Sequence, residues 1–525
     1  MSAAASEPAT PQFTHRETVV IITGLMLGMF LAALDQTIVA TALPRISADL
    51  RGAEHLSWVV SAYLLTSTAA TPIYGKLSDL YGRKPMLQAA IVIFLITSVL
   101  CGVAASMGQL IAFRALQGLG GGGLMAMAHA TIADILSPRE RGKYQGYFAA
   151  VFALASVVGP VLGGIFADYL TWRWVFWINL PIGIAALAVS QFTLKKLVAR
   201  RLRHKIDYLG ALLIVTGVTC VLLVTTMGGN EAPWNSPLIE GLAGAALLLF
   251  ALCVLQERHA SEPILPPRLF ANGIFVVSNA LNLLVSVTMI GSIVFMPLFL
   301  QMVYGLQAGD SGLMLIPFSS ATTLGAVSAG RLVAATGRYK FLPIAGLTAN
   351  LIGMTLVSTV TASTPLVLTG AYMFVTGIGL GAVMPVMLVA IQNAIHPRDL
   401  GTGTASNSFF RSMGGSFGVA LFGAVLVARL TALVGAVPGH EALGAEAGSA
   451  LLHAGSGALT LAPDGLRPAI AEAVTQAFHD MFRVGAAISL LNLVTALFLK
   501  ELPLRTTSGL ADKRGGAAAA AALGD

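Results

Sequence analysis

Long apolar runs separated by short polar breaks recur along the whole chain. Each run is about 20 residues long, which is the length at which a helix crosses the roughly 30 Å hydrocarbon core of a bilayer. The period-two alternation of a membrane-spanning β-barrel is absent. The pattern predicts an all-α integral membrane protein with fourteen transmembrane helices, at residues 18–43, 56–75, 85–106, 109–133, 145–167, 175–194, 209–227, 238–256, 274–300, 311–335, 341–361, 365–391, 402–428 and 480–499.

Composition and charge agree with a membrane protein and orient it. Only 10% of the residues are charged and the mean hydropathy is +0.80, whereas soluble domains carry roughly 25% charged residues. With the N-terminus inside, 23 of the 31 Lys and Arg residues fall in cytoplasmic segments and 5 in outer ones. Basic residues are retained on the cytoplasmic side. We therefore expect both termini in the cytoplasm, a cell-membrane location and no nucleic-acid partner for the net charge of +7.

The chain carries an internal repeat. The segment at residues 75–84 is echoed at residues 330–340, an offset of 255. Further matches occur at an offset of 259, from Gly118, Pro138 and Gly159 to Gly377, Pro397 and Gly418. Ordered matches at nearly one offset predict two six-helix halves, an arrangement that places a transporter's substrate site between the halves near the bilayer midplane.

The repeat and the polar breaks predict the domain boundaries. The helices at 209–227 and 238–256 have no counterpart, so we interpret them as an inserted central two-helix hairpin. The predicted units are an N-terminal tail at 1–17, a first half at 18–194, a linker with the hairpin at 195–272, a second half at 273–499 with a long outer loop at 429–479, and a cytoplasmic, disordered tail at 500–525.

Several motifs resemble the major facilitator superfamily, and in particular its fourteen-span drug:proton antiporters of the EmrB/QacA type. These are LDQTIV at residues 34–39, GKLSDLYGRK at 75–84, RALQG at 114–118, GPVLGG at 159–164 and WRWVFWINLP at 172–181. The resemblance covers nearly the whole chain. It implies a proton-coupled exporter of amphipathic or cationic small molecules that works by alternating access.

Asp35 is the strongest candidate for chemistry. It is the one acidic residue of 24 that we place well inside a predicted span. A carboxylate at this depth costs at least about 2.5 kcal/mol, so it normally faces the bundle interior or a water-filled cavity. Arg114 is expected at similar depth, and the resemblance implies that it takes part in proton coupling. The alternatives are a buried Asp satisfied by helix–helix hydrogen bonds and an arginine that serves only as a fixed counter-ion.

The loop after the second predicted helix supplies a different kind of candidate. The resemblance implies a conformational latch in which Asp79 lies near the start of a helix in the other half, here the thirteenth predicted span. A negative charge at a helix N-terminus is stabilising by about 0.3–1 kcal/mol. Retention of topology by basic residues explains Arg83 and Lys84 but not Asp79. The candidate latch residues are Gly75, Asp79, Gly82, Arg83 and Lys84.

Other candidates concern packing and the cargo. Small residues allow close helix approach, and the resemblance marks Gly159, Pro160, Gly163 and Gly164 as an antiporter element. His129 is more simply explained as a packed or pore-lining residue than as a proton relay. The candidates for the wall of the substrate cavity are Gln117, Asn282, Asn407 and Arg411.

Several function classes are disfavoured by the sequence. No P-loop occurs, which argues against an ATP-driven pump. The three cysteines lie inside apolar runs, so neither disulfides nor a metal site is expected. We expect no cofactor and no enzyme activity, because no polar cluster resembles a catalytic constellation. A channel or receptor remains as an alternative class, and a specific metabolite or lipid as an alternative cargo. A periplasmic adaptor and an outer-membrane channel are candidate partners if the host has two membranes.

Overall fold

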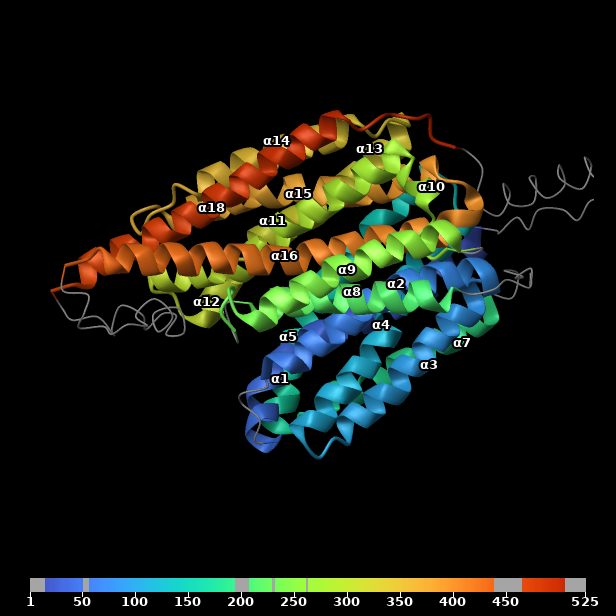
Figure 1. Cartoon of the computed structure of the whole chain (residues 1–525), viewed down its shortest axis with the longest axis horizontal. Coiled ribbons are helices and arrows are strands. Elements are labelled where there is room, and N and C mark those ends of the chain that lie inside the picture. The colour runs from blue at the N-terminus through green and yellow to red at the C-terminus, as the bar shows by residue number, and fades with distance from the viewer. Residues whose placement is uncertain are drawn as a thin grey trace, which may run out of the picture.

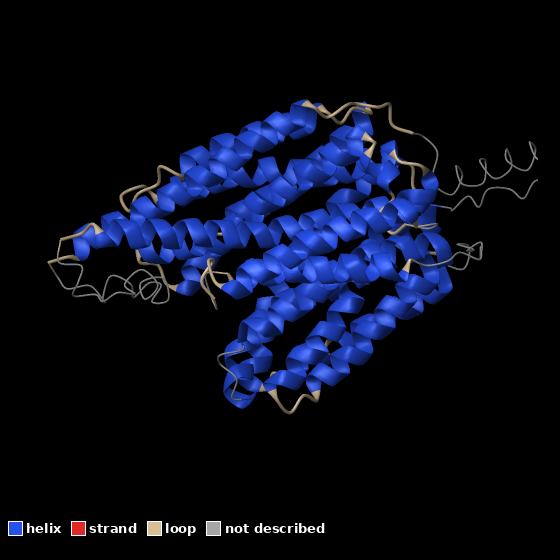
Figure 2. Ribbon diagram, viewed as in Figure 1, coloured by secondary structure: helices blue, strands red, loops and turns tan. Residues whose placement is uncertain are grey.

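The computed structural model describes residues 15–50, 56–193, 207–228, 232–260, 263–438 and 465–505, and within these ranges it contains helices and turns but no strand (Figure 2). The helices of the first half are α1 (His15–Leu50), α2 (Leu56–Tyr81), α3 (Arg83–Gly102), α4 (Met107–Ile135), α5 (Pro138–Tyr169), α6 (Trp174–Trp177) and α7 (Asn179–Thr193). Then follow α8 (Tyr208–Met227), α9 (Pro237–His259) and α10 (Pro267–Phe270). The second half contains α11 (Gly273–Tyr304), α12 (Ala308–Leu313), α13 (Ile316–Thr336), α14 (Phe341–Val357), α15 (Leu366–Ala394), the 3₁₀ turn η3 (Pro397–Asp399), α16 (Leu400–Gly435) and α18 (Arg467–Leu497).

The described helices suit a bilayer. Eleven stretches are long and apolar enough to cross a membrane, and α2, α5 and α14 lie in the same bundle without meeting that criterion. Large apolar side chains are exposed on the outside of the bundle, for example Leu247, Leu248 and Val254 of α9. Such side chains suit a helix that faces lipid. The protein is therefore a multi-pass membrane protein, and the number of fourteen spans stays a prediction.

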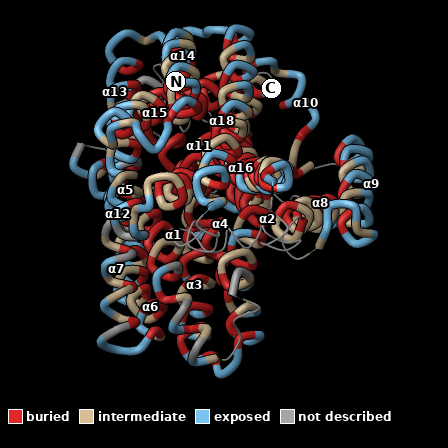
Figure 3. Tube along the Cα trace, turned by 90° about the vertical axis from the view of Figure 1, so that its left-hand side faces the viewer, coloured by how far each residue is buried: buried red, intermediate tan, exposed pale blue. Residues whose placement is uncertain are grey.

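The helices form two groups with a pair of helices beside them. Helices α1 to α7 pack on one another, as do α11 to α18, while α8 packs on α9 and also on α2 and α16 (Figures 1 and 3). We call the end of the bundle where α1 begins and α18 finishes the terminal end, and the opposite one the far end. The groups touch through α2 with α16 and α5 with α13. Toward the far end, at the left of Figure 1, α1, α3 and α4 turn away from α16 and α18.

Glycines determine how closely the helices of each half approach. In α4, a Cβ atom on Gly118 or Gly122 would collide with backbone oxygens of α2, at Tyr63 and Ser67. On another side of α4, a Cβ atom on Gly120 would lie 2.8 Å from the carbonyl oxygen of Ala90 in α3. Residues 118–123 of α4 match G-x-G-x-x-G, a pattern that also occurs in nucleotide-binding loops. Here these glycines form a helix-packing surface instead.

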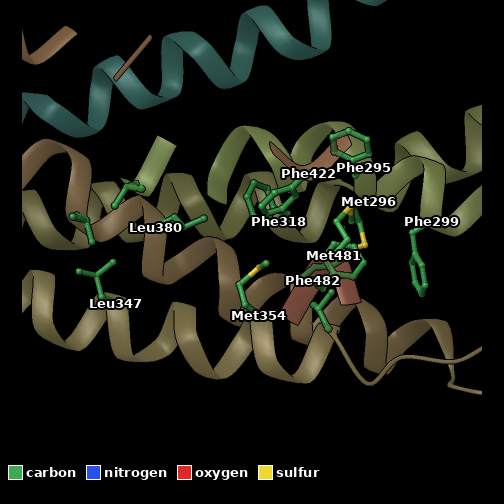
Figure 4. Packing of buried hydrophobic residues seen from close by; sticks show 14 of the residues in the cluster. Phe295, Met296, Phe299, Phe318, Leu347, Met354, Leu380, Phe422, Met481 and Phe482 are labelled. Atoms are coloured by element: carbon green, nitrogen blue, oxygen red, sulfur yellow. The ribbon is translucent and has the colours of Figure 1, made fainter. Parts of the chain in front are cut away.

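The same arrangement recurs 259 residues later, as the repeat predicts. In α15, Cβ atoms on Gly377 and Gly381 would collide with backbone oxygens of α13, and one on Gly379 with the backbone of α14. Larger apolar residues then fill the interior of the second half, where Phe299 packs edge-on against Phe478 and Phe482 and where Met354 and Phe422 are buried (Figure 4). Each half is thus a tightly packed body.

The sequence prediction was wrong about the outer loop. The loop predicted at 429–479 is helical at both ends, because α16 continues to Gly435 and α18 begins at Arg467 rather than at residue 480. The prediction ended these helices at charged residues, yet Arg429 and Asp480 pair across the two helices, with Arg429 Nη2 2.6 Å from Asp480 Oδ2. The predicted spans at 175–194 and 311–335 correspond to the apolar stretches Trp174–Thr193 and Asp310–Thr336, each with a short break between two helices. The predicted tails at 1–17 and 500–525 lie mostly outside the described residues.

Gly122→Ala is expected to destabilise the protein by about 1–3 kcal/mol, because the added methyl group must push α2 and α4 apart. Gly108→Ala is the matched control in the same helix, since no heavy atom lies within 4 Å of its added Cβ. Thermal unfolding of the two purified variants in detergent provides the measurement. Equal unfolding temperatures would contradict the proposed role of the glycine contact.

Candidate functional site

The first candidate site is an ion pair buried inside the first half. One oxygen of Asp35 in α1 lies 2.5 Å from Arg114 Nη1 in α4. The two side chains are 0% and 1% exposed. Both helices are apolar over most of their length, so packing brings the two charges together inside a protein body rather than against lipid. The structure thus joins the two residues that the sequence singled out.

Three uncharged polar side chains complete the surroundings of Asp35. Gln117 Nε2 donates to Asp35 Oδ1 at 3.1 Å, and Asn179 Nδ2 donates to the same oxygen at 3.0 Å. Ser98 Oγ accepts hydrogen bonds from both amides and donates to the carbonyl oxygen of Phe176 at 2.8 Å. Sequence reasoning assigned no role to Asn179 or Ser98. It placed Gln117 on a cavity wall, whereas the structure buries it fully in this network.

Arg114 is held by more than its acid partner. Nη1 also donates to Gln117 Oε1 at 2.7 Å, and Nε donates to the carbonyl oxygen of Val59 in α2 at 3.1 Å. The guanidinium carbon lies 4.3 Å from the centre of the Tyr63 ring, which is an attractive cation–π arrangement. The arginine therefore links α1, α2 and α4 at one point.

This geometry makes the charges of Asp35 and Arg114 depend on each other. Removing one charge of a buried pair leaves the other charge uncompensated, at a cost of about 3–5 kcal/mol. Protonation of Asp35 has the same consequence for Arg114 unless the helices rearrange. A proton on this carboxylate can therefore change the relative energy of two arrangements of α1 and α4.

The second candidate site joins the two halves at the terminal end. Asp79 of α2 accepts hydrogen bonds from the backbone nitrogens of Gly401 and Thr402, at 3.1 and 2.9 Å, and from Thr402 Oγ1 at 3.2 Å. These two residues begin α16, whose N-terminus carries a partial positive charge. A carboxylate of the first half thus caps a helix of the second half, and α16 contains the thirteenth predicted span.

Arg83 and two glycines support this contact. Arg83 pairs with Asp79 at 2.8 Å and with Asp134 of α4 at 2.7 Å, and it also hydrogen-bonds Ser78. Gly82 has a φ of 97°, a left-handed value that favours glycine, and it lets the chain turn from α2 into α3. A Cβ atom on Gly75 would collide with Ala405 of α16. Lys84 instead donates to the carbonyl oxygen of Gln191 and stays within the first half.

The GPVLGG segment brings α5 against α1 next to Asp35. A Cβ atom on Gly159 would collide with Thr37 Oγ1, and one on Gly163 with Thr41 Oγ1. Thr37 Oγ1 itself donates to the carbonyl oxygen of Ala155 in α5 at 2.9 Å. Gly164 has open space beside it, and the side chain of Pro160 lies outside the described residues. Two of the four predicted residues therefore make this close contact.

The remaining candidates lie apart from the Asp35 network. Asn282 Nδ2 of α11 donates to the carbonyl oxygen of Asn407 in α16 at 3.5 Å. Arg411 follows one turn later in α16 and is partly exposed. His129 Nδ1 contacts the carbonyl oxygen of Met125 within α4. Among the described residues, no group of three or more His, Cys, Asp or Glu side chains could hold a metal ion.

Comparison with known proteins decides the family. The model of the Major Facilitator Superfamily matches residues 25–419, which include Asp35, Arg114 and the Asp79 contact. The chain belongs to the major facilitator superfamily. Its repeat of two helix groups, with a charged contact between them at the terminal end, is thus the architecture of a transporter family.

Individual members of the superfamily resemble the chain closely. It is 37% identical over 509 residues to the multidrug transporter protein MdtP of Bacillus subtilis (strain 168), covering 92% of this chain and 93% of that protein. It is 36% identical over 502 residues to multidrug resistance protein 3 of the same organism, covering 94% and 97%. The solved structure of the proton:xylose symporter XylE has the same fold, with a TM-score of 0.62, 15% identity and coverage of 95% of this chain and 99% of that one.

Asn179→Ala is expected to destabilise this transporter by about 1–3 kcal/mol, because it leaves Asp35 Oδ1 and Ser98 Oγ each short of a buried donor. Gln191→Ala is the matched control, since this exposed amide lies in the same helix, α7. Thermal unfolding in detergent measures both variants. An unchanged unfolding temperature for Asn179→Ala would contradict its place in the network.

Proposed function

We propose that the chain is a multidrug exporter that exchanges protons for amphipathic or cationic small molecules. The single observation that carries the proposal is the Asp35–Arg114 pair, a titratable group enclosed in an apolar bundle. The names of its two Bacillus relatives support drug export. The names of the relatives do not say whether export is coupled to protons. We assign the proton-carrying role to Asp35.

The same proposal includes a topology. We propose fourteen spans, with α8 and α9 as the inserted pair, and with the terminal end facing the cytoplasm of the cell membrane. The excess of Lys and Arg in the breaks assigned to that side supports this orientation. In a host with two membranes, export would also need an adaptor and an outer-membrane channel.

We further propose that the conformation described here is the outward-facing one. The Asp79 contact closes the two halves at the terminal end, and the helices diverge toward the far end (Figure 1). In this form a proton from outside reaches Asp35 and displaces Arg114. The halves then rock about their interface, the Asp79 contact breaks, and cargo binds from the cytoplasm as the proton is released inward.

The energy of this exchange is sufficient for export. One elementary charge that moves through the membrane potential yields about 2.3 kcal/mol per 100 mV. Because a tenfold concentration gradient corresponds to about 1.4 kcal/mol, one proton per cycle supports a useful gradient of a neutral cargo. A monovalent cation exchanged for one proton moves no net charge and is driven by the pH gradient alone.

Asp35→Asn is expected to abolish uphill efflux of a dye from proteoliposomes with an imposed pH gradient, because no group is left to carry the proton. The double variant Asp35→Asn/Arg114→Gln also removes the uncompensated arginine and separates lost coupling from lost folding. Both variants should still equilibrate dye down its own gradient. Uphill efflux at the wild-type rate, at matched protein content, would remove Asp35 from the mechanism.

Asp79→Ala is expected to slow turnover roughly several-fold with little change in dye affinity, because it removes three hydrogen bonds that join the halves and none near the cargo site. Glu240→Ala, which removes an exposed carboxylate of α9, is the control. Initial rates and half-saturating dye concentrations provide the comparison. A large loss of affinity at normal turnover would exclude the latch role.

A further inference from the structure

Arg411 is an arginine inside a long apolar helix. It lies in α16, eleven residues after the helix begins at Leu400 and one turn beyond Asn407. Within the described part of the chain, its guanidinium makes no hydrogen bond or ion pair, and the residue is partly exposed. The two most buried arginines differ in this respect, because Arg114 pairs with Asp35 and Arg83 pairs with Asp79 and Asp134.

Arg411 belongs to the helix of the second half that packs against α2 and α4 of the first half. His129 lies on α4. Helices α4 and α16 are in contact. An imidazole is neutral or positively charged, so His129 cannot neutralise an arginine of α16. Arg411 and His129 thus lie on two helices that meet between the halves.

Polar atoms without partners lie one helical turn before this arginine in α16 and on the neighbouring helix α11. Asn407 Nδ2 and Asn282 Oδ1 are buried and, among the described residues, make no hydrogen bond. The bond from Asn282 Nδ2 to the carbonyl oxygen of Asn407 holds the Asn282 side chain beside the backbone of Asn407. A buried donor that lacks a partner is costly, and natural structures seldom retain one without a use. An amide donor one helical turn from a guanidinium matches the two oxygens of an acidic group.

We propose that Arg411, assisted by Asn407, binds an anionic group of the cargo, such as a carboxylate, so that this transporter prefers amphipathic acids over lipophilic cations. This inference rests on the proposed export function and specifies its cargo. A planar guanidinium binds a carboxylate through parallel hydrogen bonds. The site is complementary to such an anion because the buried carboxylates of Asp35, Asp79 and Asp134 are already paired with Arg114 and Arg83.

The test compares rhodamine B, which carries a free carboxylate, with its ethyl ester, which has the same rings without the acid. Each dye is titrated onto purified protein in lipid nanodiscs, and binding is followed by fluorescence polarisation without any proton gradient. The wild-type protein should bind the acid more tightly than the ester. Arg411→Gln should weaken binding of the acid about tenfold or more, which is the scale of one charge-assisted hydrogen bond, and should change binding of the ester less than twofold or strengthen it.

Three further variants make the outcome specific to the charge. Arg411→Lys should retain most of the preference for the acid. Asn407→Asp places a carboxylate one turn from Arg411 and should reduce that preference without deleting the arginine, which keeps the test valid if Arg411→Gln fails to fold. Arg429→Gln, in the same helix but paired with Asp480, should leave both affinities unchanged.

The proposal is overturned if the wild-type protein binds the ester as tightly as the acid, or if Arg411→Gln and Asn407→Asp weaken both dyes equally. Export of the dyes from proteoliposomes is measured separately. A failure to export either dye would count against the export function. The binding data from nanodiscs would still decide whether the protein prefers the acid.

Discussion

The structure depends most on the pairing of Asp35 with Arg114. An isolated charge in an apolar bundle is costly, and removal of either residue leaves the other uncompensated at a cost of about 3–5 kcal/mol. The hydrogen bonds from Gln117 and Asn179 hold the carboxylate, and the contacts with Val59 and Tyr63 hold the arginine. The groups that contact this ion pair come from α1, α2, α4 and α7, so all four helices depend on the charge balance between Asp35 and Arg114. A proton that changes this balance acts on the packing of the whole first half.

Close helix packing explains why such a change could move whole halves. Glycines of α4 and α15 bring each of these helices against two neighbours at backbone distance, and the same contacts occur in both halves. Bodies packed in this way transmit strain instead of absorbing it. Between the halves, by contrast, the terminal end combines charged and polar contacts around Asp79 with a small apolar cluster in which Ala133 of α4 packs with Ile395 and Leu400.

The sequence predicted the fold well because the relevant physics is local. Apolar runs of membrane length, basic residues in alternate breaks and a glycine repeat each leave a pattern that needs no three-dimensional knowledge. Asp35 and Arg114 could be anticipated for the same reason, since charges are rare in such a chain. The helix that Asp79 caps was instead implied by the resemblance to the superfamily. Asn179 and Ser98 could not, because single uncharged polar residues are common in apolar helices. The outer ends of α16 and α18 were missed because paired charges allow a helix to continue beyond the apolar run.

Exchange through Asp35 requires that cargo and proton bind the transporter in turn. Addition of a transported dye to the purified protein in a weakly buffered detergent solution tests this requirement directly, with a pH-sensitive indicator as the readout. Dye binding is expected to release protons from the wild-type protein within the titrated pH range, whereas Asp35→Asn is expected to bind dye without releasing any. Equal proton release from both proteins, or dye binding to the wild type without release across the titrated pH range, would contradict it.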